Sequence, residues 1–203
     1  MTIIAKATAT EFEKFPLPEE GTIQAVCAGV WDLGLQSTPF IDERTGQPKV
    51  QHKIVIAWEL NQMIDAPESE YHGKPYMLSK TYTLSLGEKA NLRHDLESWR
   101  GKPFTDEQIS EGFDIETLYG VNCLVGVAHV TKNDKTFANI TSILPPIKGM
   151  EKMKPVRGKD EAPPKWVQEK AASAVKPVEV VEDDPFGVPD DEPRYMGEGD
   201  GHF

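Results

Sequence analysis

The chain has 203 residues, an apolar fraction of 38% and a formal net charge of −11. This composition fits a globular protein with one packed core and excludes a uniformly basic nucleic-acid-binding domain. The first residues, MTIIAKATATEFEKF, lack the apolar run of a signal peptide, and no stretch approaches the length of a membrane span. We therefore expect a soluble protein of a reducing cytoplasm, in which Cys27 and Cys123 are small core residues.

Charge is unevenly distributed along the chain. Residues 1–150 carry 14 Lys and Arg against 20 Asp and Glu, residues 151–178 carry 7 against 4, and residues 179–203 carry 1 against 9. This pattern predicts a folded domain (1–150), a basic, Pro-containing linker (151–178) and an acidic, disordered tail (179–203). The tail has too little apolar surface to fold by itself, and such charge asymmetry is typical of an interaction segment.

Three strands are predicted in the first half of the chain. The run TIQAVCAGVWDLG (22–34) is rich in small and β-branched residues, and the polar loop STPFIDERTGQPK follows it. The run VQHKIVIAWEL (50–60) alternates apolar and polar residues with the period of a strand. After a second polar loop, YMLSKTYTLSL (76–86) is predicted to form the third strand.

The next segment is predicted to be helical. Ser85 and Glu88 have the spacing of a capping box, and Gly101 and Pro103 mark the end of the helix. Three apolar residues fall at helical spacing and predict one buried stripe: Leu92, Leu96 and Trp99.

A second, shorter helix is predicted from Thr105, with Gln108 as its capping-box partner, to near Gly112. The runs VNCLVGVAHV and TFANITSIL then read as two strands around a tight turn. The order β-β-β-α-β-β predicts a mainly β fold, a five-stranded OB-fold barrel with a helix between strands 3 and 4. A generic small barrel and an α+β sheet are the alternatives.

Three blocks carry a resemblance to a known family: VWDLGLQ at 30–36, IAWEL at 56–60, and the long block from Tyr82 to Val130. They are similar to the OB-fold single-stranded-DNA-binding proteins of tailed bacteriophages and prophages. The resemblance spans roughly residues 20–150. It implies a role in phage DNA replication or recombination inside a bacterial host cell, and an acidic C-terminal tail that recruits phage or host replication and recombination proteins.

Binding of single strands requires flat side chains that stack on bases and cations that follow the phosphates. Nine residues of the predicted strands and the last turn are candidates on this ground: Trp31, Lys49, Lys53, Tyr76, Lys80, Tyr82, Lys132, Lys135 and Phe137. The aromatic candidates have core filling as their alternative role, and the lysines have solvated surface. Trp58 and Trp99 share faces with apolar residues, so we assign both to the core.

The tail is expected to bind a partner protein through acids that flank an aromatic anchor. The candidate residues are Asp183, Asp184, Pro185, Phe186 and Phe203. In the best-known bacterial pattern of such acidic tails, Pro-Phe stands at the very C-terminus. Here Pro185-Phe186 is internal, so Phe186, Phe203 or both are candidate anchors. In the linker, Trp166 has three open roles: stacking on DNA, docking on the barrel, or membership of a short helix.

No catalytic or metal-binding motif is recognisable, because the histidines are scattered and neither a G-x-S-x-G sequence nor a phosphate-binding glycine loop is present. We therefore expect a protein that is not an enzyme and has no cofactor. The leading interpretation is non-catalytic binding of single-stranded DNA. The alternatives are an OB-fold adaptor that binds only proteins, and a binder of structured RNA or duplex DNA. The oligomeric state is left open.

Overall fold

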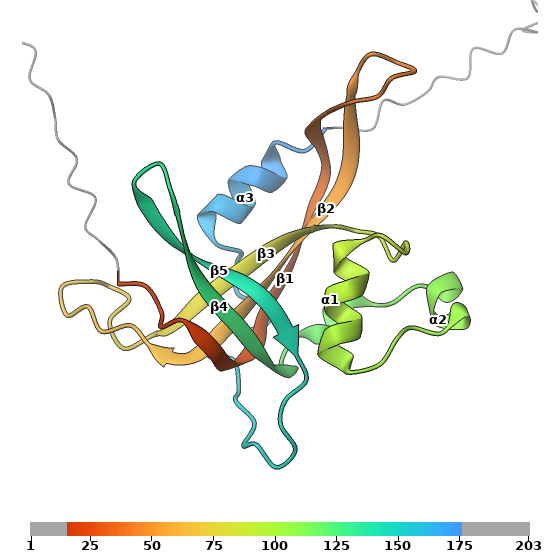
Figure 1. Cartoon of the computed structure of the whole chain (residues 1–203). Coiled ribbons are helices and arrows are strands. Elements are labelled where there is room, and N and C mark those ends of the chain that lie inside the picture. The colour runs from red at the N-terminus through yellow and green to blue at the C-terminus, as the bar shows by residue number, and fades with distance from the viewer. Residues whose placement is uncertain (1–15, 176–203) are drawn as a thin grey trace, which may run out of the picture.

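A computed structural model describes residues 16–175. Its five strands are β1 (Gly21–Ile41), β2 (Pro48–Met63), β3 (Pro75–Thr83), β4 (Asn122–Lys132) and β5 (Lys135–Leu144). The helices are α1 (Asn91–Arg100), α2 (Asp106–Glu111) and the 3-10 helix η1 (Ile115–Leu118), all between β3 and β4, and α3 (Lys165–Ala172) after β5. The strands form one antiparallel sheet in the order β3-β2-β1-β4-β5 (Figure 1).

The predicted mainly β fold is confirmed, as is the position of helices between the third and fourth strands. The predicted barrel is not confirmed. Within the described residues the sheet is open, and β3 and β5 are its two edges. The sheet nevertheless curves strongly, so that the two edges approach each other.

The first strand is longer than predicted. It was expected to end at Gly34, with a polar loop from Ser37, but β1 continues to Ile41 and pairs there with Pro48. The register shifts three times along this pair, and such bulges bend a long strand without ending it. The β1–β2 hairpin therefore projects well beyond the rest of the sheet (Figure 1).

The start of α1 also differs from the prediction. The Ser85–Glu88 capping box is wrong, because the Ser85 hydroxyl accepts a hydrogen bond from the Gly87 N–H, and the helix begins only after Ala90. The predicted end is confirmed, since Gly101 adopts the left-handed conformation (φ 66°) that glycine accommodates without strain. The predicted apolar stripe is buried: Leu92, Leu96 and Trp99.

Two further local predictions are confirmed. Thr105 and Gln108 form a reciprocal capping box at the start of α2. The β4–β5 hairpin turns through Asn133 and Asp134, both with positive φ (51° and 59°), the backbone that a tight two-residue hairpin turn requires.

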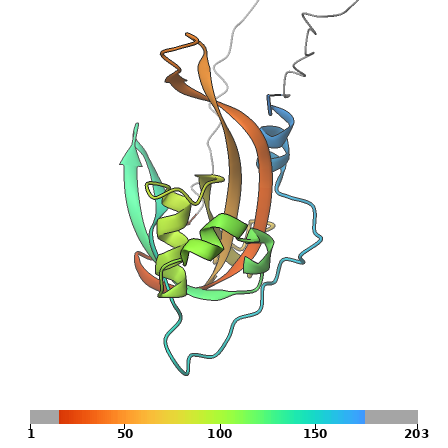
Figure 2. The same ribbon diagram turned by 90° about the vertical axis from the view of Figure 1, so that its right-hand side faces the viewer.

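The sheet carries an apolar cluster on each face. The main core lies inside the curve and is covered by α1; its β2 members are Ile54, Ile56, Trp58 and Leu60. Cys27 and Cys123 are buried there as free thiols, as predicted. The second cluster lies on the outer face of β1 and β2, where Leu33 and Val55 contact Val167 of α3. Figure 2 shows α3 on this outer side, away from α1.

The segment that precedes α3, which we call the strap (residues 151–164), is attached to the sheet by two buried polar side chains. The Glu59 carboxylate accepts hydrogen bonds from the backbone N–H groups of Val156 (2.6 Å) and Arg157 (2.9 Å). The Asn122 side chain exchanges two hydrogen bonds with the backbone of Met153 (2.7 and 2.9 Å). The strap and α3 belong to the region predicted as a linker (151–178), and both lie against the sheet.

Of the roles left open for Trp166, membership of a short helix is observed, and that helix docks on the sheet. Within residues 16–175, no helix is long and apolar enough to cross a membrane. The predicted partner-binding residues Asp183, Asp184, Pro185, Phe186 and Phe203 lie outside the described residues.

Candidate nucleic-acid interface

A cavity of about 650 Å³, here called the aromatic groove, lies between the starts of β3 and β5. Its lining includes Tyr71 from the loop before β3, Tyr76 from β3, Phe137 from β5 and Trp166 from α3. Residues 16–18 and several aliphatic side chains complete it. Three stretches of the chain that are distant in sequence, at residues 71–76, 137 and 166, therefore bring aromatic rings to one concave site.

Three of these rings are accessible to a ligand. Tyr71 is 47% exposed, Phe137 49% and Trp166 42%, whereas Tyr76 is almost buried at the floor of the groove. Among the described residues, Phe40 is the other exposed aromatic side chain, and it lies near the tip of the β1–β2 hairpin. Exposed rings gathered in one groove mark a binding surface more strongly than rings scattered singly.

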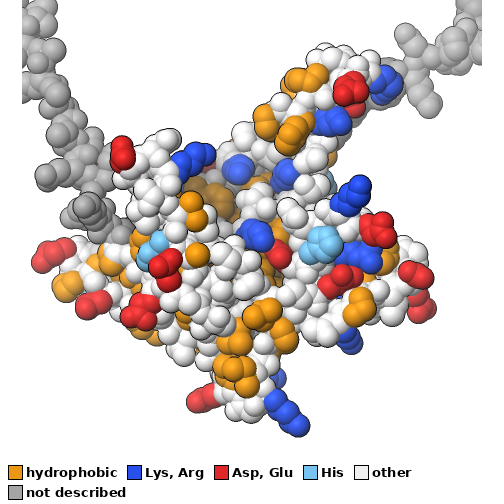
Figure 3. Space-filling view, in the orientation of Figure 1, with side chains coloured by type: hydrophobic (Ala, Val, Ile, Leu, Met, Phe, Trp, Pro, Cys, Tyr) orange, Lys and Arg blue, Asp and Glu red, His pale blue; other side chains and the backbone are white. Residues whose placement is uncertain are grey.

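Cations flank the groove. The Lys74 ammonium lies 5.1 Å from the centre of the Tyr71 ring. Lys132 and Lys135 face each other across the β4–β5 hairpin, and Lys135 is two residues before Phe137. Figure 3 shows a recess between the two hairpins, with hydrophobic side chains in it and Lys and Arg side chains around it. This surface can stack flat groups and attract anions although the chain as a whole is acidic.

Lys49 and Lys53, both predicted contacts, lie on β2. Lys49 is exposed near the start of the strand. The Lys53 ammonium donates hydrogen bonds to Gln51 Oε1 (2.6 Å) and Thr83 Oγ1 (2.7 Å). Burial lowers the pKa of Lys53, and the charge of Lys170 lowers it further.

Two other predicted contacts, Lys80 and Tyr82, point to the inner face of β3. The Lys80 ammonium forms an ion pair with Asp95 of α1 (2.6 Å), and the Tyr82 hydroxyl donates to the same carboxylate (2.7 Å). Tyr82 is buried in the main core, and burial together with Asp95 raises the pKa of its hydroxyl. The structure gives both residues partners within the fold.

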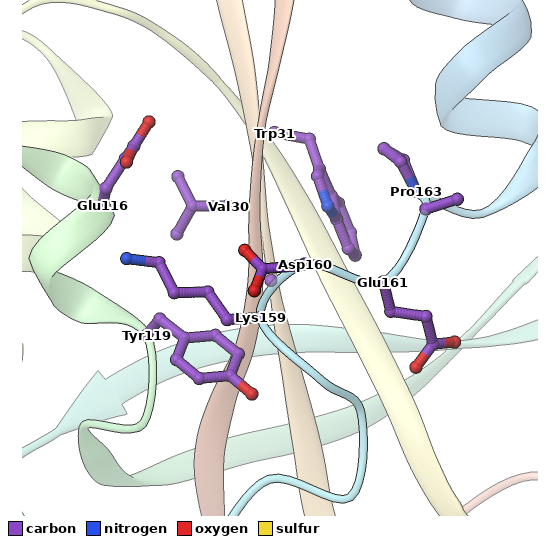
Figure 4. Close-up of a pocket in the computed structure, with 10 residues that line it drawn as sticks. Val30, Trp31, Glu116, Tyr119, Lys159, Asp160, Glu161 and Pro163 are labelled. Carbon is purple, nitrogen blue, oxygen red and sulfur yellow. The ribbon is translucent and has the colours of Figure 1, made fainter.

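Trp31 lies in a different pocket, of about 310 Å³, beneath the strap (Figure 4). The guanidinium of Arg157 lies 5.4 Å from the centre of its ring. The same pocket is lined by Glu116, Asp160, Glu161 and Lys159, and Glu161 is paired with Arg157 (3.1 Å). These carboxylates would repel a phosphate, and Trp31 does not line the aromatic groove.

The structure thus brings together Tyr76, Phe137, Lys132 and Lys135 of the predicted residues, and it adds Tyr71 and Trp166. Tyr71 lies in a polar loop with no periodic pattern, so no sequence signal distinguished it. Within the described residues, no three His, Cys, Asp or Glu side chains are grouped so that they could hold a metal ion.

No protein-family model matches this chain, and a comparison with curated proteins found no match.

Proposed function

We propose that this protein binds single-stranded DNA in the aromatic groove without chemically changing it. The observation that carries the proposal is the gathering of three exposed aromatic rings, from three separate segments, in one concave site. Rings of this kind stack on unpaired bases of any sequence, at about 1–3 kcal/mol per base. A duplex hides its base faces and cannot use such a groove.

The strand order supports an OB-fold as the finer description of the sheet. In that fold, a five-stranded Greek-key sheet closes on itself, and its loops and outer surface bind single strands. Here β3 and β5 are the edges that would meet on closure. The aromatic groove is lined from both of these edges, so the ligand would lie along the seam.

The charge of the chain sets the character of the binding. Because the net charge is −11, attraction of the DNA backbone depends on the local cations at the groove rather than on the whole surface. We include Lys132, Lys135 and Lys49 in the proposed interface, since all three are exposed on the two hairpins. A role in phage replication or recombination, inside a bacterial cell and with partners bound by the acidic tail, is proposed on the sequence resemblance.

Tryptophan fluorescence tests the proposal, because the four tryptophans lie in different environments. Trp58 and Trp99 are buried in the main core, Trp31 lies under the strap, and Trp166 faces the groove. Saturating oligo-dT should quench the tryptophan fluorescence of the wild-type protein. In Trp166→Phe this quenching should be lost, although a labelled oligonucleotide still binds. In the matched control, Trp31→Phe, the quenching should persist.

A second pair of variants tests stacking directly. Phe137→Ala should weaken oligo-dT binding by about 1–3 kcal/mol, the value of one stacked base. Phe40→Ala, which removes an even more exposed ring that does not line the groove, should leave the affinity unchanged. In Mg²⁺ and ATP, the DNA should stay intact.

Three results would contradict the proposal. Equal binding of duplex DNA or structured RNA would point to a ligand that does not need stacked bases. Equal losses in Phe137→Ala and Phe40→Ala would remove the groove from the interface. If the wild-type protein binds no nucleic acid, the largely apolar groove would instead suit a peptide, as in the alternative of an adaptor that binds only proteins.

A further inference from the structure

Two lysines on the outer side of the sheet are not part of the aromatic groove: Lys53 of β2 and Lys170 in the last turn of α3. Lys53 stands on the outer face of β2, because it lies two residues from Val55, which contacts α3. Its ammonium is held by Gln51 and Thr83, at 2.6 and 2.7 Å. These bonds use two of its three N–H groups and leave the third for a ligand.

The end of α3 is fixed above the same point of the sheet. Gly34 is the direct partner of Lys53 in the β1–β2 pair, and a side chain on Gly34 would come within 3.1 Å of Ala174 Cβ. The Lys170 carbonyl accepts from Gln36 Nε2 (3.0 Å). The N–H of Val175 donates to the Leu35 carbonyl (2.7 Å). The end of α3 is therefore held over β1 at residues 34–36, the stretch of β1 that pairs with Lys53 and its neighbours on β2.

The two lysines interact as like charges. Lys170 lowers the pKa of Lys53, after burial, which is the larger cause. Within residues 16–175, neither ammonium forms an ion pair with a carboxylate, whereas Lys80 pairs with Asp95 and Lys165 lies 3.9 Å from Glu169. An anion placed between Lys53 and Lys170 would replace their repulsion with two attractions.

Helix α3 connects the two lysines with the aromatic groove, because it carries both Lys170 and the groove residue Trp166. Trp166 and Lys170 are four residues apart, so they lie on the same side of the helix, about 6 Å apart along its axis. The sheet-facing residues of α3 are Val167 and Ala171, each one position later. A ligand stacked on Trp166 would therefore meet Lys170 one helical turn further on.

We propose that Lys53 and Lys170 together bind one phosphodiester group of a single strand whose bases stack in the aromatic groove. This inference rests on the proposed function and adds α3, from the predicted linker, to the interface. A nucleic-acid strand is favoured over an acidic peptide, because the cations continue directly from aromatic rings that suit bases.

The test measures the affinity of the full-length protein for labelled oligo-dT at several salt concentrations. Lys53→Gln, Lys170→Gln and the double variant should weaken binding. The plot of log K against log salt concentration has a negative slope. Since both lysines bind the same phosphate, the magnitude of this slope should decrease by about 0.7 in the double variant, not by twice that amount. Lys170→Arg should keep the wild-type slope.

The matched control is Lys148→Gln, which makes the same charge change in the exposed loop after β5, at the opposite end of the molecule from the hairpins (Figure 1). Lysine acetylation read by mass spectrometry gives a second readout that does not depend on folding of a variant. Oligo-dT should protect Lys53 and Lys170 of the wild-type protein and leave Lys148 reactive.

The outcomes separate the two proposals. If the wild-type protein binds oligo-dT but the Lys53 and Lys170 variants match Lys148→Gln in affinity and slope, the phosphate site is wrong and the proposed function stands. If oligo-dT does not bind at all, both are wrong. Protection of the two lysines by an oligo-aspartate peptide but not by oligo-dT would overturn the phosphate site in favour of a protein ligand.

Discussion

Replacement of Glu59 should detach the strap from the sheet. Glu59 is 4% exposed, and both of its carboxylate oxygens accept backbone N–H groups of the strap, at 2.6 and 2.9 Å. Glu59→Gln keeps the size of the side chain and one acceptor oxygen. Its other terminal atom becomes an NH₂ group, which donates and cannot accept from a backbone N–H.

The size of the effect follows from these contacts. A hydrogen bond to a charged group contributes about 1.5–3 kcal/mol, and a buried N–H left unpaired costs about 1–3 kcal/mol. We expect Glu59→Gln to lower the free energy of unfolding by about 2–4 kcal/mol, a large part of the roughly 5–15 kcal/mol of a typical domain. Release of the strap limits the loss, because freed N–H groups can bond to water.

Urea denaturation at neutral pH measures this loss, and hydrogen exchange locates it. The amides of Val156 and Arg157 should exchange faster in Glu59→Gln, ahead of global unfolding. Glu169→Gln, which removes an exposed acid of α3, is the control and should change stability by less than about 0.5 kcal/mol. If Glu59→Gln is as stable as this control and its two amides stay protected, Glu59 does not hold the strap.

Two further predictions concern the sheet. Burial raises the pKa of the Cys27 thiol to about 12, and burial also raises the pKa of Cys123. At pH 8 neither should react with a thiol reagent until the protein unfolds; rapid native-state labelling would place one outside the core. Gly29→Ala should destabilise the protein by about 1–3 kcal/mol, because a Cβ there would lie 2.2 Å from the Trp31 ring. The loss should shrink in a Trp31→Ala background, and purely additive losses in urea denaturation would refute this contact.

Elements with a strong local cause were predictable from the sequence. The alternation from Val50 to Leu60 specified β2, since the side chains on one face of a strand recur at every second residue. The Thr105–Gln108 box specified the start of α2, because both of its hydrogen bonds are made within four residues. In contrast, Ser85 had the right spacing for a capping box but its hydroxyl bonds to Gly87 instead, an alternative that spacing alone cannot exclude.

Alternation assigns residues to two faces of a strand, but it does not say what covers each face. Glu59 reads as an outward-facing polar residue of β2, and only the tertiary structure makes it the buried anchor of the strap. Trp31 and Phe137 were equivalent candidates in the sequence. The fold places one under the strap beside carboxylates and the other in an open groove.

The sequence by itself determined the mainly β fold, the helices between the third and fourth strands, and the core positions of Trp58 and Trp99. These follow from periodicity and turn chemistry, which act within a few residues. The tertiary structure alone decided the aromatic groove, because Tyr71, Phe137 and Trp166 meet there from segments far apart in the chain. Their meeting depends on the curvature of the sheet and on the docking of α3, and both arise from contacts between residues distant in sequence.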